Sequence, residues 1–350
     1  MKAAIRADGG KDIGMGHIMR CMVLANAFSE NVELSFIIKE DSSVVKLLEE
    51  KGFEIITIDY NLDYQAEIRR VKEIIIKKEI EILITDSYEL DQNYLTELKK
   101  EVAKLVSIHD FAPFAFPSDI VINGNIYAPK RDYQSLTGKT EFLLGTDYTL
   151  LRNEFTNISK TVLDNEGVKR ILVTFGGGDP LNLTPQILGS LNKIEDKLIA
   201  NNIKIDVVVG PAFNNLAEIV EKVKESNLEV TLHFNIKQMS KLMLDSDLAI
   251  SAGGSTLYEL TATGTPAIVL LQAENQVLAA EAMAEEGLII NLGFWDESKE
   301  EKLIDNLTNL INNLNLRYKM SKKGQEIVDG KGAERCAEEI ISVCVSDSCL

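Results

Sequence analysis

The chain has few of the residues that would place it among disulfide-rich or metal-dependent proteins. Its 350 residues include only four cysteines, and no two of them form a C-x-x-C pair. Four cysteines are too few for a disulfide framework in a chain of this length, which agrees with a reducing compartment. The three histidines, His17, His109 and His233, do not have the spacing of metal ligands, so nothing in the residues argues for zinc.

Positive charge and long apolar runs are also scarce. Lys and Arg number 37 against 54 Asp and Glu, which gives a formal net charge of −17. Such a chain would repel nucleic acid and anionic lipid, because both require clustered Lys and Arg. No apolar run approaches the roughly 18 residues that span a bilayer, and the N-terminal MKAAIRAD lacks the apolar core of a signal peptide. We expect no nucleic-acid partner, no membrane insertion and a cytoplasmic location, and the oligomeric state stays open.

What the chain does contain is a repeated alternation of short Ile- and Val-rich runs with segments of helical periodicity. This is the pattern of β-α units around a parallel sheet. Residues 64–78, for example, are typical of an amphipathic helix. The expected strands are 3–6, 33–38, 54–58, 80–85, 105–108 and 120–122 in the first half, and 169–174, 204–209, 229–232, 247–250, 267–271 and 288–290 in the second.

Residues 145–168 interrupt this alternation because they are polar and lack a clear strand. They divide the chain into an N-terminal domain at 1–150 and a C-terminal domain at 151–350, which ends in a helical tail from about 298 to 345. Two similar halves imply a cleft between them, and open parallel sheets bind ligands at the carboxyl ends of their strands. The sequence therefore predicts an α/β fold of two Rossmann-like domains facing across a cleft.

Three glycine-rich turns, IRADGGKDIGMGH, VTFGGGDP and AISAGGSTLYEL, each lead from a predicted strand into a predicted helix. Glycine lets the backbone approach a ligand, and a helix start offers unpaired N–H groups, so each turn could bind a phosphate. Tight turns of this kind also use glycine for purely structural reasons. The first turn has Met19 where the fingerprint G-x-G-x-x-G requires its third glycine, which is evidence against NAD.

The third turn permits two interpretations. Ser255 and Thr256 follow Gly253 and Gly254 at the start of a predicted helix, and Glu259 lies on the same helical face. In a capping box, Glu259 would return to the backbone of Ser255 or Thr256. In a nucleotide site, the hydroxyls and N–H groups would bind a diphosphate, and Glu259 would accept hydrogen bonds from two ribose hydroxyls.

Several other polar residues follow predicted strands. His17 is either a helix-start residue that fills a hydrogen bond or a general base, and a helix N-terminus favours the neutral imidazole that a base must be. Asp86 and Tyr88 should lie at the rim of the cleft, where the residues alone favour a turn-forming Asp and a partly buried Tyr. Residues 109–110 could cap a loop or belong to the site. We find no partner for His233 and interpret it as structural.

Eight segments of the chain, in order, resemble a known family. They are IRADGGKDIGMGHIMRCMVLA, LITDSYEL, SIHDF, DIVINGNIYA, LGTDYTLLRNEF, TFGGGDP, and AISAGGSTLYELTATGTPAIVL with AENQ. Together they are similar to the UDP-sugar hydrolases of pseudaminic acid biosynthesis over about residues 2–285. The resemblance implies a GT-B-like fold and the inverting hydrolysis of UDP-2,4-diacetamido-2,4,6-trideoxy-beta-L-altropyranose to UDP and free sugar. The alternative is a GT-B-type glycosyltransferase that passes a sugar from a UDP-sugar to an acceptor.

The resemblance also implies roles for individual residues. His17 would activate the attacking water, with no metal and no cofactor, while the C-terminal domain binds UDP. Arg152 and Glu259 match substrate- and nucleotide-binding positions, and Tyr88 and Asn275 match positions that line the sugar pocket. The full set of candidate substrate- and nucleotide-binding residues is Gly14, Gly16, Arg20, Tyr88, Asn125, Arg152, Gly177, Gly178, Gly254, Ser255, Thr256, Glu259 and Asn275.

The chain departs from the family at two places. His109 stands where relatives commonly carry an acidic residue, so no role can be copied onto that position. The tail beyond about residue 290 is longer than in compact members, and we expect a helix there that packs back across the domains.

Overall fold

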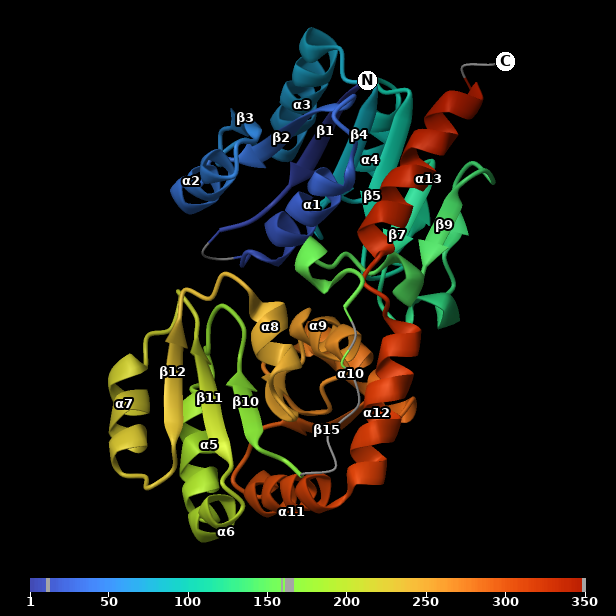
Figure 1. Ribbon diagram of the computed structural model, residues 1–350. Coiled ribbons are helices and arrows are strands. Elements are labelled where there is room, and N and C mark those ends of the chain that lie inside the picture. The colour runs from blue at the N-terminus through green and yellow to red at the C-terminus, as the bar shows by residue number, and fades with distance from the viewer. Residues whose placement is uncertain (11–12, 159, 161–166, 348–350) are drawn as a thin grey trace. The chain divides into compact units, whose positions relative to one another are not determined.

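The computed structural model describes residues 1–10, 13–158, 160 and 167–347, with side chains as far as residue 344. These residues form two compact units, one made of Met1–Arg152 with Lys331–Leu350 and the other of Asn153–Gly330. Each unit contains a parallel sheet with helices packed on it (Figure 1), so the predicted α/β fold with two Rossmann-like domains is confirmed. No helix within the described ranges is both long and apolar enough to cross a lipid bilayer.

The first unit is built on a seven-stranded sheet of order β3-β2-β1-β4-β5-β7-β9. Its strands are β1 (Lys2–Ala7), β2 (Glu33–Lys39), β3 (Glu54–Ile58), β4 (Ile82–Asp86), β5 (Lys104–Ile108), β7 (Ile120–Asn123) and β9 (Glu141–Leu144). A separate small sheet pairs β6 (Ala115–Phe116) with β8 (Gln134–Ser135). The helices are α1 (Gly16–Ala27), α2 (Ser42–Glu50), α3 (Tyr64–Lys78), α4 (Gln92–Lys99) and α13 (Gly332–Asp347), with 3-10 turns η1 (Ala128–Lys130) and η2 (Thr146–Tyr148).

Both faces of this sheet are buried, which is why its strands read as continuous apolar runs. Along β4, Ile82 and Ile84 enter the hydrophobic cluster that contains Ile18 of α1, whereas Leu83 enters the cluster that contains Val71 of α3. Successive side chains of a strand point to opposite faces, so one strand serves two cores. Parallel strands with covered faces bring all their carboxyl ends to one edge, and that edge carries the candidate site described below.

The second unit is built on a six-stranded sheet of order β12-β11-β10-β13-β14-β15. Its strands are β10 (Arg170–Thr174), β11 (Lys204–Val209), β12 (Val230–Phe234), β13 (Leu248–Ala252), β14 (Ala267–Leu271) and β15 (Ile289–Phe294). The helices are α5 (Leu183–Asn192), α6 (Glu195–Ala200), α7 (Leu216–Lys224), α8 (Met239–Leu244), α9 (Thr256–Thr263), α10 (Val277–Glu285), α11 (Lys299–Asn312) and α12 (Leu314–Ile327), with 3-10 turns η3 (Asn153–Phe155) and η4 (Glu274–Gln276).

Each of the twelve expected strands is present, with some ends shifted, and α3 has the predicted bounds. Asp63 caps the start of α3, because its side chain accepts a hydrogen bond from the Ala66 amide at 2.8 Å. The strand β9 and the small sheet were not expected from the sequence. Of the interrupting segment 145–168, residues 159 and 161–166 lie outside the described residues, and the described remainder contains no strand.

The tail is helical as expected, but it does not all belong to the second unit. Helices α11 and α12 lie in the second unit, whereas α13 packs against α1 in the first (Figure 1). Cys336, Ala337 and Ile340 of α13 are buried in the same hydrophobic cluster as Ile18. Assigning all of 151–350 to one domain is therefore corrected at Lys331, because the apolar face of α13 is buried in the first unit.

Candidate active site

The candidate base His17 lies where β1 gives way to α1, at the carboxyl edge of the first sheet. Gly10 and Gly14 exchange two backbone hydrogen bonds, of 2.8 and 3.2 Å, and have φ angles of 127° and 85°. Only glycine adopts such angles readily, so this pairing needs glycine at both positions. Helix α1 begins two residues after Gly14, at Gly16, with no side-chain cap from Met15.

His17 is paired with Asp86, the last residue of β4. The two side chains are 8% and 0% exposed, and His17 Nδ1 lies 2.6 Å from Asp86 Oδ1. Arg20, one turn further along α1, donates from Nε to Asp86 Oδ2 and from Nη2 to Asp86 Oδ1, both at 2.6 Å. Positions three and four residues apart share a helical face, which also brings the Cys21 thiol to Asp86 Oδ2 at 3.4 Å.

The charge of Asp86 determines which nitrogen of His17 is basic. Burial acts to raise the pKa of Asp86, but Arg20 outweighs it and the pKa is lowered. A carboxylate can only accept hydrogen bonds, so His17 Nδ1 carries the proton and donates it to Asp86. The other nitrogen, Nε2, then holds a lone pair. The interpretation of Asp86 as a turn-forming residue is therefore wrong, because its side chain is buried and faces α1.

Arg20 joins Asp86 to a second buried carboxylate, Asp110. Its Nη1 donates to both oxygens of Asp110, at 2.8 and 2.9 Å. The Tyr88 hydroxyl donates to Asp110 Oδ2, and Asn125 Nδ2 donates to Oδ1 at 2.9 Å. Burial again acts to raise the pKa of Asp110, and Arg20 and Tyr88 lower it. Two interpretations were open for Asp110, a loop cap and a residue of the site. These contacts favour the second.

Aromatic rings cover one side of His17. The Tyr88 ring meets the His17 ring edge-on, with centroids 4.7 Å apart, and Tyr88 is 45% exposed. The ring of His109 lies 5.9 Å from that of Tyr88 and its Nδ1 accepts the Phe111 amide at 3.1 Å. Burial lowers the pKa of His109, so this imidazole is neutral at neutral pH. His109 therefore caps the loop after β5 and packs among rings.

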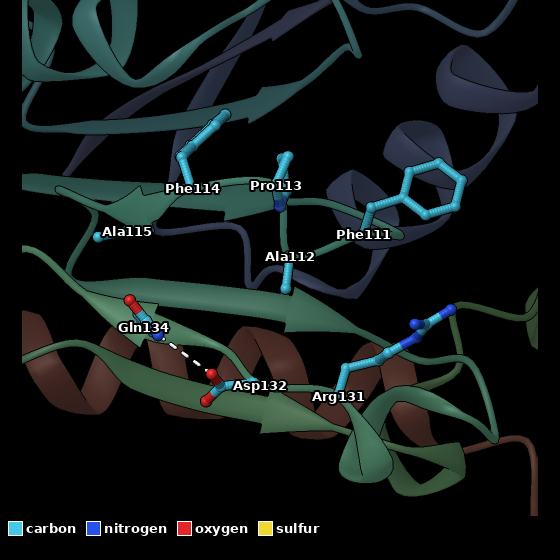
Figure 2. Close-up of a pocket in the computed structure, with 8 residues that line it drawn as sticks. All are labelled: Phe111, Ala112, Pro113, Phe114, Ala115, Arg131, Asp132 and Gln134. Atoms are coloured by element: carbon cyan, nitrogen blue, oxygen red, sulfur yellow. Dashed lines mark hydrogen bonds between the residues drawn. The ribbon is translucent and has the colours of Figure 1, made fainter.

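A pocket of about 530 Å³ opens beside this aromatic group. It is lined by Phe111, Ala112, Pro113, Phe114, Ala115, Arg131, Asp132 and Gln134 (Figure 2). None of these residues was a candidate from the sequence. The Phe111 ring lies 5.5 Å from the Tyr88 ring, so the pocket wall continues the surface that surrounds His17.

In the second unit, a carboxylate of the turn after β10 already accepts hydrogen bonds from the first amides of α5. Asp179 accepts the amides of Leu183 and Thr184, the first residues of α5, at 2.8 and 2.7 Å. The first two amides of α5 therefore already have an acceptor, so a phosphate at this turn would have to bind other groups of the turn. Gly177 and Gly178 remain at this turn, the first exposed and the second partly so, and their role stays a prediction.

The turn after β13 differs from the turn after β10 in its capping. Ser255 is the N-cap of α9 but makes no side-chain capping bond, so the serine half of the capping box is missing. Ser255 is exposed, and Gly254, Thr256 and Glu259 are partly exposed. Gly253 is tightly enclosed, since a Cβ there would lie 2.7 Å from Leu271 Cδ2. The nucleotide interpretation of this turn stays a prediction.

Two glutamines connect these turns at the carboxyl edge of the second sheet. Gln272 follows β14 and donates from Nε2 to Asp179 Oδ1 at 3.2 Å. The backbone amide of Gln272 donates to Gln276 Oε1 at 2.9 Å, and the Gln276 side chain also lies against Gly253. Asn275 is exposed in η4 beside them. Arg152 is partly exposed and is the last residue of Met1–Arg152, the first of the two segments of the first unit. Its role in substrate binding stays a prediction.

His233 has a partner that the sequence did not reveal. Its Nε2 lies 2.6 Å from Asp206 Oδ1, and Arg170 donates to the two oxygens of Asp206 at 2.9 and 3.0 Å. The three residues come from the adjacent strands β12, β11 and β10. The statement that His233 lacks a partner is wrong, because strand pairing brings Asp206 beside it. Within the described residues, no group of three His, Cys, Asp or Glu side chains is placed to hold a metal ion.

Comparison with known proteins agrees with this architecture. The model of the glycosyltransferase family 28 C-terminal domain matches residues 170–337. The spore coat polysaccharide biosynthesis protein SpsG of Bacillus subtilis is 30% identical over 96% of this chain and 96% of its own length. The chain belongs to the SpsG family. An uncharacterized protein of Methanocaldococcus jannaschii is 33% identical over 79% of this chain, which spans 57% of that relative.

The resemblance to the UDP-sugar hydrolases is confirmed for this SpsG-family chain. The UDP-2,4-diacetamido-2,4,6-trideoxy-beta-L-altropyranose hydrolase of Campylobacter jejuni is 28% identical over 82% of this chain and 97% of its own length. Among solved structures, MurG of Acinetobacter baumannii superposes with a TM-score of 0.72 at 14% identity, covering 98% of this chain and all of MurG. The fold is therefore GT-B-like.

Most side chains of the candidate site in the first unit were predicted from the sequence, but the hydrogen bonds between them were not. His17, Arg20, Tyr88 and Asn125 were candidates, and the structure brings all four to one network in which Arg20 joins Asp86 to Asp110. Asp86 was interpreted as a turn-forming residue. Its position at the end of a strand that pairs with β1, directly beside the start of α1, could have identified it as a site residue.

Proposed function

We propose that the protein is a UDP-sugar hydrolase that converts UDP-2,4-diacetamido-2,4,6-trideoxy-beta-L-altropyranose to UDP and the free sugar in pseudaminic acid biosynthesis. The observation that carries the proposal is the 2.6 Å contact between His17 Nδ1 and the Asp86 carboxylate. This pairing leaves His17 Nε2 as an oriented lone pair, which is what a general base requires. Membership of the SpsG family and the named Campylobacter jejuni relative support the choice of substrate.

In the proposed reaction, His17 Nε2 takes a proton from water while the water oxygen attacks the anomeric carbon. The bond from that carbon to the diphosphate oxygen breaks on the opposite face, and its electron pair leaves with UDP. Attack and departure on opposite faces invert the anomeric centre. Asp86 stabilises the imidazolium that forms, in the way that a buried carboxylate supports a catalytic histidine.

The second unit is proposed to bind the leaving group. The backbone amides at the start of α9, with Gly254, Ser255 and Thr256, would stabilise the negative charge that develops on the diphosphate. Glu259 would accept hydrogen bonds from two ribose hydroxyls. With a leaving group stabilised in this way, one base suffices, and the two carboxylates of ordinary glycosidases are not required.

The test uses the purified full chain with the UDP-sugar and no acceptor. UDP release and the configuration of the new anomeric centre are followed by proton NMR, in the presence and absence of EDTA. We expect release by the wild type with or without EDTA, and a loss of about 10²–10⁴-fold in His17→Gln. His233→Gln is the matched control, because His233 is also a histidine paired with an Asp and an Arg, and it should retain activity. Full activity in His17→Gln would refute the proposal.

A glycosyltransferase is the second candidate, favoured by the match to the glycosyltransferase family 28 C-terminal domain. Its nucleotide site would be the same, but His17 would take the proton of an acceptor hydroxyl. The same assay separates the two functions. If wild-type protein binds the UDP-sugar and releases no UDP until an acceptor is added, the transferase is correct.

A further inference from the structure

Within the described residues, three groups of side chains pair a buried carboxylate with an arginine, and one of these groups is unbalanced in charge. We name the unbalanced group the His17 cluster and define it as His17, Arg20, Asp86 and Asp110. Its hydrogen bonds join one guanidinium to two carboxylates, with the imidazole against the first carboxylate. With His17 neutral, the formal charge of the cluster is therefore −1.

The titratable neighbours of the cluster do not change this sum. Burial raises the pKa of the Cys21 thiol well above its ordinary value. Burial and the nearby Asp110 carboxylate raise the pKa of the Tyr88 phenol. Burial lowers the pKa of His109, the remaining ionisable ring near Tyr88. Burial also raises the pKa of Tyr127 and Tyr133, two further phenols that interact with Asp110. All five groups are uncharged at neutral pH, so the excess negative charge belongs to Asp86 and Asp110.

The two other groups are balanced. Arg6, fully buried on β1, binds Asp8 at 2.6 Å and Glu67 at 2.8 Å, and Lys39 lies 3.5 Å from Glu67. The buried and partly buried side chains of this group, two positive and two negative, cancel, and Lys39 also binds the exposed carboxylate of Glu89 at 2.7 Å. In the second unit, the opposite charges of Arg170 and Asp206 cancel each other beside His233. The residue that sets the His17 cluster apart is the additional carboxylate, Asp110.

We propose that Asp110 is a positioning residue that acts through Arg20 to leave one uncompensated negative charge beside His17, so that the cluster takes up one proton, at His17 Nε2. The reaction role rests on the proposed function, whereas the charge effect does not. Arg20 divides its donors between two carboxylates, so Asp86 is only partly neutralised and remains able to stabilise an imidazolium. In a buried site this attraction is stronger than in water, because the local dielectric is lower. The proton that leaves water during attack would bring the cluster to neutrality.

The first experiment measures the charge effect without any substrate. Histidine side chains of the full chain are labelled with nitrogen-15, and the pH at which each imidazole gains its proton is followed by NMR. The chain has only three histidines, so His17→Gln assigns its signal by loss. Asp110→Asn removes one negative charge and should move protonation of His17 to lower pH by about one unit. Arg20→Gln removes one positive charge and should move it to higher pH.

The control is Asp63→Asn. It removes the same charge from an exposed helix cap outside the His17 cluster, and Asn also caps helices, so the signal of His17 should not move. Circular dichroism establishes which variants fold. Arg20→Gln alone still tests the proposal if Asp110→Asn does not fold. If the signal of His17 titrates at the wild-type pH in every folded variant of Asp110 and Arg20, the proposal is overturned.

The second experiment follows the pH dependence of kcat/KM for UDP release. In Asp110→Asn the limb that reports the base should move to lower pH, with a lower maximum and little change in KM, because Asp110 would act on proton transfer. A uniform fall in kcat/KM with no shift of this limb would mean a purely structural role and would overturn the proposal. If no variant and no wild-type protein releases UDP, the proposed function fails, while the NMR titration still decides the charge effect.

Discussion

Asp86 Oδ1 lies 2.6 Å from His17 Nδ1, although the two residues are 69 positions apart in the chain. The contact joins the carboxyl end of a central strand to the first turn of α1. A histidine fixed in this way presents one defined nitrogen to a ligand, whereas an unpartnered imidazole exchanges its proton between both. The function proposed for this SpsG-family chain depends on that contact.

Replacing Asp86 by Asn should therefore reduce activity without removing the imidazole. The amide can donate to His17 Nδ1, which would place the ring proton on Nε2 and abolish the base. We expect kcat for UDP release to fall about 10²–10⁴-fold, with KM changed much less. Asp206→Asn makes the same change beside His233 and should leave kcat within about twofold where the protein is folded. Equal kcat values for Asp86→Asn and the wild type would contradict the role given to the carboxylate.

The two glycines before α9 should respond differently to substitution by alanine. At Gly253 a Cβ would lie 2.7 Å from Leu271 Cδ2 and 3.0 Å from Gln276 Oε1, so we expect about 1–3 kcal/mol of destabilisation in urea unfolding. At Gly254 the nearest atom, Gln276 Nε2, is 3.8 Å away, so stability should change by less than about 0.5 kcal/mol. If a phosphate approaches this backbone, Gly254→Ala should still weaken UDP binding about tenfold in calorimetry. Wild-type affinity in Gly254→Ala would count against a phosphate there.

Glu259→Ala should weaken UDP binding. Hydrogen bonds to a charged acceptor contribute about 1.5–3 kcal/mol, so loss of the ribose contacts should raise Kd about 10–100-fold. Glu221→Ala, on the exposed side of α7 in the same unit, removes an equal charge and should bind UDP as the wild type does. Titration with uridine alone should show the same loss as titration with UDP. A variant that binds both ligands normally would leave the ribose without an assigned partner.

His109 should make folding depend on pH below neutrality. Burial lowers the pKa of His109 in the folded protein, whereas an exposed imidazole titrates near 6.5. Between these two values the unfolded chain binds more protons than the folded one, so stability rises with pH, is complete above about 6.5, and is lost as pH falls through the folded value. His109→Asn keeps an acceptor for the Phe111 amide and lacks this titration. The difference in unfolding free energy between wild type and variant should shrink from pH 7.5 to pH 5. A constant difference would contradict the buried, neutral imidazole.

Much of the fold follows from local patterns. The apolar runs of β4 and β13 could be predicted because strands of a covered parallel sheet are buried on both faces. Helix α3 could be predicted to the residue because Asp63 caps it and its apolar positions recur with helical spacing. The strand β9 was missed because its four residues lie at the sheet edge with little pattern of their own. Assignment of α13 to the first unit depends on side-chain packing between distant segments, which no local pattern reveals.

The candidate site was predicted residue by residue and missed as a network. His17 and Arg20 share one motif, and their spacing on a helix already places them on one face. Asp86 ends β4 and Asp110 follows the end of β5, and only the order of the strands brings both to Arg20. The same holds for Asp206, which meets His233 through strand pairing. The carboxylate of Asp179 accepts the first amides of α5, a contact that the glycines of that turn did not indicate.

The sequence by itself determined the class of fold and the three glycine turns, because periodicity and glycine content are local properties of the chain, and its resemblance to a known family singled out the candidate base. The tertiary structure decided which acids face that base, which helix start a carboxylate already fills, and which unit buries the last helix. Those are contacts between segments far apart in the chain, and their electrostatic effect exists only once folding has removed the groups from water.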